Sequence, residues 1–152
     1  MAATLIGAAP GCDDADGSDG SDEGGTDGAD IADPVCDDLL TPSDFAMVCG
    51  SELTLEPTVF EGIELNPCNR DAEDDEAILL VTRHTDEQTA MSAANVAGGR
   101  GPNLQAGLGL QASAGSRSVF TVEVKATDRS DALCQPDALP QLLDIVLDRI
   151  ED

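Results

Sequence analysis

Residues 36–50, CDDLLTPSDFAMVCG, contain a short helix with a full set of start and stop signals. Thr41 can accept hydrogen bonds from backbone amides as the N-cap, and Pro42 suits the first helical position, where a missing amide costs nothing. Asp44 completes a T-x-x-D pattern similar to a capping box and adds negative charge at the positive end of the helix dipole. The stretch therefore predicts a helix that begins at Pro42 and stops at Gly50.

The apolar residues of this stretch orient the predicted helix. Leu40 and Phe45 have the spacing of a hydrophobic staple, which fixes the angle at which the chain enters the helix. Phe45, Val48 and Cys49 share one helical face at positions i, i+3 and i+4. We therefore expect the side chain of Cys49 to point inward.

The five cysteines divide into one that stands apart, Cys12, and four in the rest of the chain: Cys36, Cys49, Cys68 and Cys134. No pair forms C-x-x-C, and the single histidine, His84, has no close cysteine partner, so a zinc site is not expected. Four such thiols favour two disulfides and thus an oxidising, extracytoplasmic compartment. The alternative is four free structural thiols.

Charge and composition exclude several classes of partner. The chain of 152 residues has 31 acidic and 7 basic side chains and a formal net charge of −24, so nucleic acids and anionic lipid surfaces should repel it. Its three aromatic residues are all phenylalanines, which predicts an aliphatic core with few platforms for stacking bases or sugars. No run of 18 apolar residues is present to span a membrane as a helix.

Residues 1–11, MAATLIGAAPG, are small and mainly apolar and lead directly to Cys12. Ala9, Pro10 and Gly11 precede the cysteine, an arrangement similar to the cleavage site of bacterial lipoprotein signals. Because no Lys or Arg precedes the apolar stretch, we expect translation to start further upstream. We predict a signal-peptide remnant over 1–11 and a lipid on Cys12; the alternative is an ordinary disordered N-terminus with an unrelated cysteine.

Residues 12–33 follow as an acidic tether, with nine acids and no base after Cys12. This segment has too little apolar surface to fold, and repulsion between its charges extends it. A calcium loop is the alternative, because an EF-hand-like spacing can be traced through Asp19, Ser21, Glu23, Gly24 and Asp30. No helices flank this spacing, and Asp30 replaces the bidentate glutamate, so we predict a tether and no metal or other cofactor.

The first half of the predicted domain, residues 34–152, reads as a helix followed by strands and a second helix. Alternating apolar residues over 53–59 indicate an edge strand, since Pro57 cannot lie in mid-sheet, and Ile63 and Leu65 are candidates to extend the sheet. Residues 70–76 read as a charged loop and 77–82 as a central strand. A helix is expected over 86–97, capped by Thr85 with Gln88, with an inner face of Ala90, Met91, Ala94 and Ala97.

The second half predicts a hairpin and a final helix. Apolar residues alternate over 104–112 and again over 120–126, and a turn is expected around Gly115. Pro136 or Pro140 opens the last helix, whose wide apolar stripe can cover a sheet: Leu139, Leu142, Leu143, Val146, Leu147 and Ile150. The predicted fold class is α+β, a two-layer sandwich in which three helices cover an antiparallel sheet of about four to five strands.

The order of these motifs resembles that of uncharacterised envelope lipoproteins common in actinobacteria, whose domain is similar to the extracellular sensor domains of some mycobacterial receptor kinases. The resemblance rests on Cys12 and the polar tether, the Cys-x-x-Leu-Leu-Thr-Pro helix, and Cys68 before a central strand. It also rests on a Gly-Leu-Gly segment at 107–109, the strand SVFTVEV at 118–124 and the amphipathic terminal helix. It implies a non-catalytic envelope protein with a Cys36–Cys68 disulfide, which leaves Cys49 for Cys134.

Three classes of function follow from these predictions. The first is a membrane-anchored binding or sensor-like domain, expected to be a monomer, that recognises an envelope protein or a small apolar ligand. The second is a purely structural envelope or secreted domain. The third is a hydrolase that uses His84, which would need carboxylates converging on it in a cleft, and the chain has no G-x-S-x-G, H-E-x-x-H or Walker motif.

Overall fold

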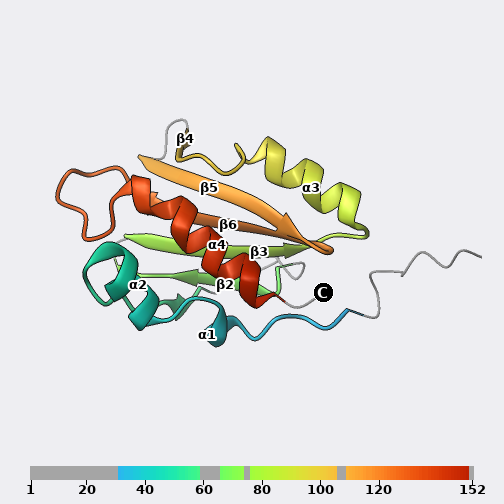
Figure 1. Ribbon diagram of the computed structural model, residues 1–152, viewed down its shortest axis with the longest axis horizontal. Helices are drawn as coiled ribbons and strands as arrows, with labels where there is room; N and C mark the ends of the chain where they lie inside the picture. Colours follow the sequence, from blue (N-terminus) through green and yellow to red (C-terminus); the bar gives the residue numbers. More distant parts are fainter. Residues whose placement is uncertain (1–30, 59–65, 74–75, 106–108, 151–152) are drawn as a thin grey trace, which may run out of the picture.

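The computed structural model describes residues 31–58, 66–73, 76–105 and 109–150. These residues form an α+β fold around one antiparallel sheet, as predicted, with six strands in the order β1-β2-β3-β6-β5-β4 (Figure 1). The strands are β1 (Glu56–Pro57), β2 (Cys68–Asp71), β3 (Ala77–Arg83), β4 (Asn103–Gln105), β5 (Leu110–Arg117) and β6 (Phe120–Thr127). The helices are α1 (Cys36–Leu39), α2 (Pro42–Cys49), α3 (Glu87–Val96), the 3-10 helix η3 (Pro136–Ala138) and α4 (Leu139–Arg149).

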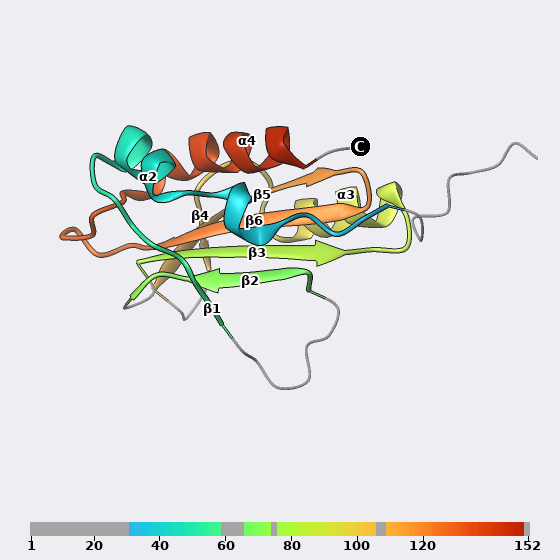
Figure 2. The ribbon, with the colours of Figure 1, turned by 90° about the horizontal axis from the view of Figure 1, so that it is seen from below.

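The main core lies between the sheet and α4. Figure 2 shows α4 and α2 together above one face of the sheet. All six residues of the predicted terminal stripe are buried, and they face the inward side of β6, whose residues Phe120, Val122, Val124 and Ala126 are buried as expected. Pro136 opens η3 and Pro140 lies in the first turn of α4, so both candidate prolines begin a helix.

Helix α2 has the predicted bounds and caps. The Asp44 carboxylate accepts hydrogen bonds from the Thr41 backbone amide, at 2.7 Å, and from the Thr41 hydroxyl, at 2.8 Å. Gly50 is the C-cap with φ of 78°, a left-handed conformation that glycine adopts without steric cost. Phe45 is completely buried, so the apolar face of this helix packs into the core as the sequence predicts.

Helix α3 packs on the opposite face of the sheet, over β5 and β6. The Thr121 hydroxyl donates to the Ala90 carbonyl, whereas its neighbour Val122 faces the α4 side. Ala90 and Ala94 are buried, but the prediction that Met91 lies in the inner face was wrong, because 45% of its surface is exposed. The predicted cap was also one residue early: Asp86, not Thr85, accepts from the Thr89 amide at 2.8 Å.

The β5–β6 hairpin is confirmed, but its turn lies elsewhere than expected. Ser118, with φ of 51°, and Val119 connect the strands, and Arg117 pairs with Phe120. Gly115 lies within β5, where a Cβ atom would stand 2.8 Å from the Leu147 side chain of α4. Glycine is therefore needed here for the close approach of the helix and not for a turn.

Two further strand predictions needed correction. The alternating segment 104–112 is not one strand, because β4 and β5 pair antiparallel with Leu104 opposite Gln111. The predicted loop over 70–76 was partly wrong, because its first residues belong to β2, which pairs with β3. The prediction of a central strand at β3 is confirmed. Pro57 lies in the edge strand β1, as predicted. Val59, Ile63 and Leu65 lie outside the described residues.

Two disulfides join the helical layer to the rest of the domain. Cys36 of α1 is bonded to Cys68 of β2, with Cα atoms 5.6 Å apart. Cys49 at the end of α2 is bonded to Cys134 just before η3, with Cα atoms 4.8 Å apart. This is the pairing that the resemblance implied, and it attaches both short helices covalently to the domain.

Candidate functional site

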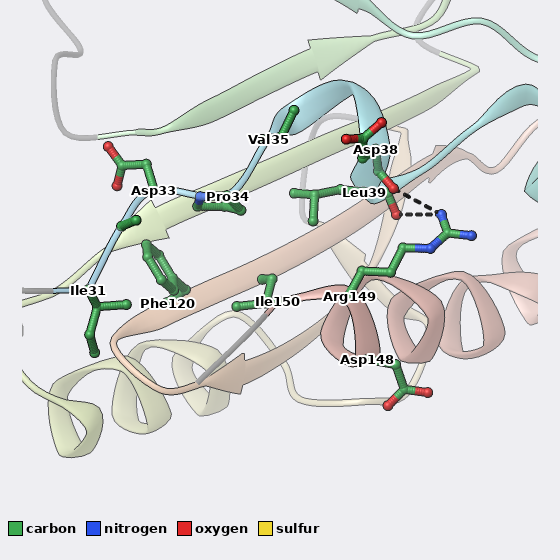
Figure 3. A pocket seen from close by; sticks show the side chains of 11 residues that line it. Ile31, Asp33, Pro34, Val35, Asp38, Leu39, Phe120, Asp148, Arg149 and Ile150 are labelled. Atoms are coloured by element: carbon green, nitrogen blue, oxygen red, sulfur yellow. Dashed lines mark hydrogen bonds between the residues drawn. The ribbon is translucent and has the colours of Figure 1, made fainter.

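A cavity of about 820 Å³ lies where the 31–35 segment passes between the end of α4 and the start of β6. Figure 3 shows the side chains of α1, α4 and Phe120 around it. Its lining is formed by Ile31, Ala32, Asp33, Pro34, Val35, Asp38, Leu39, Phe120, Asp148, Arg149 and Ile150. The volume falls in the range of small-molecule sites.

The inner wall of the cavity is apolar and rigid. Leu39, Phe120 and Ile150 are buried and belong to the core, so packing fixes their positions. Ile31 packs against the same core, whereas Val35 has 65% of its surface exposed at the cavity. The cavity therefore combines a preformed apolar surface with an apolar side chain that is still accessible.

Arg149, which lines the cavity, forms an ion pair with Asp44 of α2. Arg149 donates to both carboxylate oxygens of Asp44, at 2.6 and 2.8 Å, and to the backbone carbonyls of Asp38 and Leu39, at 3.2 and 3.1 Å. These hydrogen bonds from Arg149 are the main reason why the pKa of Asp44 falls from 3.8 to about 2, and those from Thr41 add to the effect. The pair joins residues 105 positions apart in the sequence.

A second arginine holds the 31–35 segment in place. The guanidinium of Arg83 donates to Asp33 at 2.9 Å and to the Ile31 carbonyl, and it lies 5.1 Å from the centre of the Phe120 ring. Residues 31–33, which the sequence assigned to the tether, therefore contact the domain. This contact gives the cavity its outer wall.

The remaining basic residues are also engaged. All seven lie in the described part of the chain, and ion pairs join Arg70 to Asp37, Arg100 to Asp144, Lys125 to Glu123, and Arg129 to Glu76 and Asp131. Arg117 likewise interacts with another group. Among the acidic residues of the cavity, Asp38 and Asp148 form no ion pair with a described residue, although the charge of Asp38 acts on Arg149.

Few of the residues singled out in the sequence lie at this cavity. His84 follows β3 and lines neither it nor a smaller cavity of about 210 Å³ near Leu55, and its Nε2 atom is buried without a partner in the described structure. Cys12 and the residues of the calcium alternative lie outside the described ranges. Within those ranges no group of acidic, histidine or cysteine side chains could hold a metal ion.

The cavity could not be predicted from the sequence, because most of its residues belong to no motif. Arg149 stands in the last turn of a helix, where a basic residue is common for its effect on the helix dipole alone. The T-x-x-D pattern accounts for Asp44 as part of a helix cap. Only the pairing of these two residues in space shows that one carboxylate serves both the cap and the ion pair.

The fold and the cavity define a disulfide-bonded α+β domain. Two disulfides are compatible with a domain that resides outside the cytoplasm, and none of the helices in the described ranges is long and apolar enough to cross a membrane. No protein-family model matches the chain, nor does any curated protein or solved structure.

Proposed function

We propose that this chain is a bacterial cell-envelope lipoprotein, anchored through Cys12, whose domain binds a ligand in the cavity at the 31–35 segment and catalyses no reaction. The observation that carries the proposal is the cavity itself, because a preformed apolar wall with a few charged groups at its rim is typical of a binding site. The two disulfides support the extracytoplasmic location. The resemblance to actinobacterial envelope lipoproteins agrees with this assignment.

The cavity also favours binding over the two alternatives. A purely structural domain has no need for a cavity of about 820 Å³ with an apolar inner wall. A hydrolase based on His84 would need this side chain in a cleft with convergent carboxylates, and His84 does not line the cavity.

Filling the cavity should abolish ligand binding without unfolding the domain. We expect Val35→Trp to prevent retention of a compound that the wild-type chain captures from a small-molecule extract of bacterial envelopes, detected by native mass spectrometry. Val35 is exposed at the cavity, so the larger ring can occupy the space with little effect on the core. Met47→Trp is the matched control, since Met47 is 71% exposed, close to the 65% of Val35, but lies on α2 outside the cavity. Equal retention by all three proteins, or by none, would contradict the proposal.

The anchor can be tested separately. When the gene is expressed with its upstream codons in a bacterial host, we expect the wild-type protein to incorporate labelled fatty acid and to sediment with membranes. Cys12→Ser should lose both properties, because serine lacks the thiol through which the proposed lipid is attached. Membrane association that persists without label in the Cys12→Ser variant would show that the protein is held by another means.

A further inference from the structure

We infer that the ligand of this cavity is an organic cation with an aliphatic body. The inference rests on the proposed binding function and adds the chemical class of the ligand. Three features of the cavity support this class of ligand: the arginines are already paired, one carboxylate is not, and the surface between these charged groups is apolar.

Neither Arg149, which lines the cavity, nor Arg83, which holds the 31–35 segment, is available to an anionic ligand. Both terminal nitrogens of Arg149 donate to Asp44, and one of them also donates to two backbone carbonyls. Arg83 is bound by Asp33 and the Ile31 carbonyl, with the Phe120 ring against its guanidinium. An anion would have to displace a carboxylate from either guanidinium, so it gains little by binding here.

The charge that is left at the cavity is negative. Asp38 is exposed at the α1 end of the cavity and forms no ion pair with the described part of the chain. Figure 3 shows this carboxylate projecting from α1 on the side where Val35 lies, whereas the carboxylate of Asp148 projects from α4 in the direction away from α1. With 31 acidic against 7 basic residues, the whole chain also attracts cations to its surface. A positively charged group next to Asp38 is therefore attracted both by this carboxylate at short range and by the negative charge of the whole chain at long range.

The body of the ligand should be apolar. The buried side chains of Leu39, Ile150 and Phe120 line the cavity away from Asp38, and the exposed side chain of Val35 lines it near α1. An aliphatic chain in contact with these side chains removes apolar surface from water on both partners. The site thus recognises a cation by one carboxylate and its aliphatic body by the apolar wall.

Three probes with the same eight-carbon chain separate these contributions: octyltrimethylammonium, octanesulfonate and 1-octanol. We expect the full chain to bind octyltrimethylammonium at least about fivefold more tightly than 1-octanol, with octanesulfonate weaker than both, because a partly exposed charge pair contributes about this much. Titrations below the micelle concentration, followed by NMR of the methyl groups of Val35, Leu39 and Ile150, report both the affinity and the location. Equal affinity for the three probes, or preference for the sulfonate, would overturn the inference.

Two variants, each of which removes one negative charge, test the role of Asp38. Asp38→Asn should weaken octyltrimethylammonium binding about fivefold and leave 1-octanol binding unchanged, whereas Asp137→Asn, which removes the same charge from an exposed residue outside the cavity, should change either affinity less than about twofold. An effect of Asp137→Asn as large as that of Asp38→Asn would show that only the general acidic field attracts the cation and would refute the assignment. If the envelope compound blocked by Val35→Trp proves neutral or anionic, the class of ligand is wrong while the proposed binding function stands.

Discussion

Removal of the Cys49–Cys134 disulfide by the double substitution Cys49→Ser/Cys134→Ser is expected to lower the free energy of unfolding by about 4.5 kcal/mol. The bond closes a loop with a sequence separation of 85, and its loss restores that conformational freedom to the unfolded chain. Since small domains are stabilised by only about 5 to 15 kcal/mol, this change should leave the domain close to its folding threshold.

The second disulfide gives an internal comparison. Cys36→Ser/Cys68→Ser opens a loop with a sequence separation of 32, for which the same reasoning gives a loss of about 3.7 kcal/mol. Urea denaturation of the oxidised proteins, monitored by circular dichroism, measures both losses, and Cys12→Ser serves as the control that should leave the stability unchanged. Losses below about 1 kcal/mol for both double variants would show that the disulfides do not hold this domain together.

Loss of the arginine from the ion pair should also destabilise the domain strongly. We expect Arg149→Met to lower the free energy of unfolding by about 2 to 3 kcal/mol near pH 7, because it leaves the Asp44 carboxylate without its charged partner. The Asp44 side chain is only 8% exposed and cannot recover its hydration, whereas that of Arg149 is 37% exposed. Asp44→Asn, the matched control, should therefore cost less, since water can solvate the unpaired guanidinium.

The pH dependence of the stability lost in Arg149→Met identifies the origin of that loss. The pKa of Asp44 is lower in the folded protein, about 2, than its ordinary value of 3.8, so the pair stabilises the fold above about pH 4 and loses this effect as the pH falls toward 2. The contribution that disappears amounts to about 2 kcal/mol. Urea denaturation of wild type and Arg149→Met from pH 6 to pH 2 should show the two stabilities converging below pH 4. A constant difference over this range would mean that Arg149 acts through packing alone.

Local patterns predicted most of the secondary structure correctly. The T-P-x-D signal located α2 with both caps, because a cap depends on residues within a few positions of each other. The alternation over 120–126 and the stripe of α4 identified two elements that face each other in the core. Failures arose where one pattern serves two structures: Gly115 permits a close helix contact and not a turn, and Met91 has helical spacing but lies on an exposed part of α3.

The sequence by itself determined the α+β class, the capped helix, the hairpin strands and a set of four cysteines suited to two bonds, because these depend on short-range spacing and composition. The tertiary structure alone decided which charges meet and where the chain leaves a space. Arg149 reaches Asp44 across 105 positions, and Arg83 reaches Asp33 across 50, so no local pattern can reveal either pair. The cavity exists because these contacts hold the 31–35 segment and the end of α4 beside the same apolar wall.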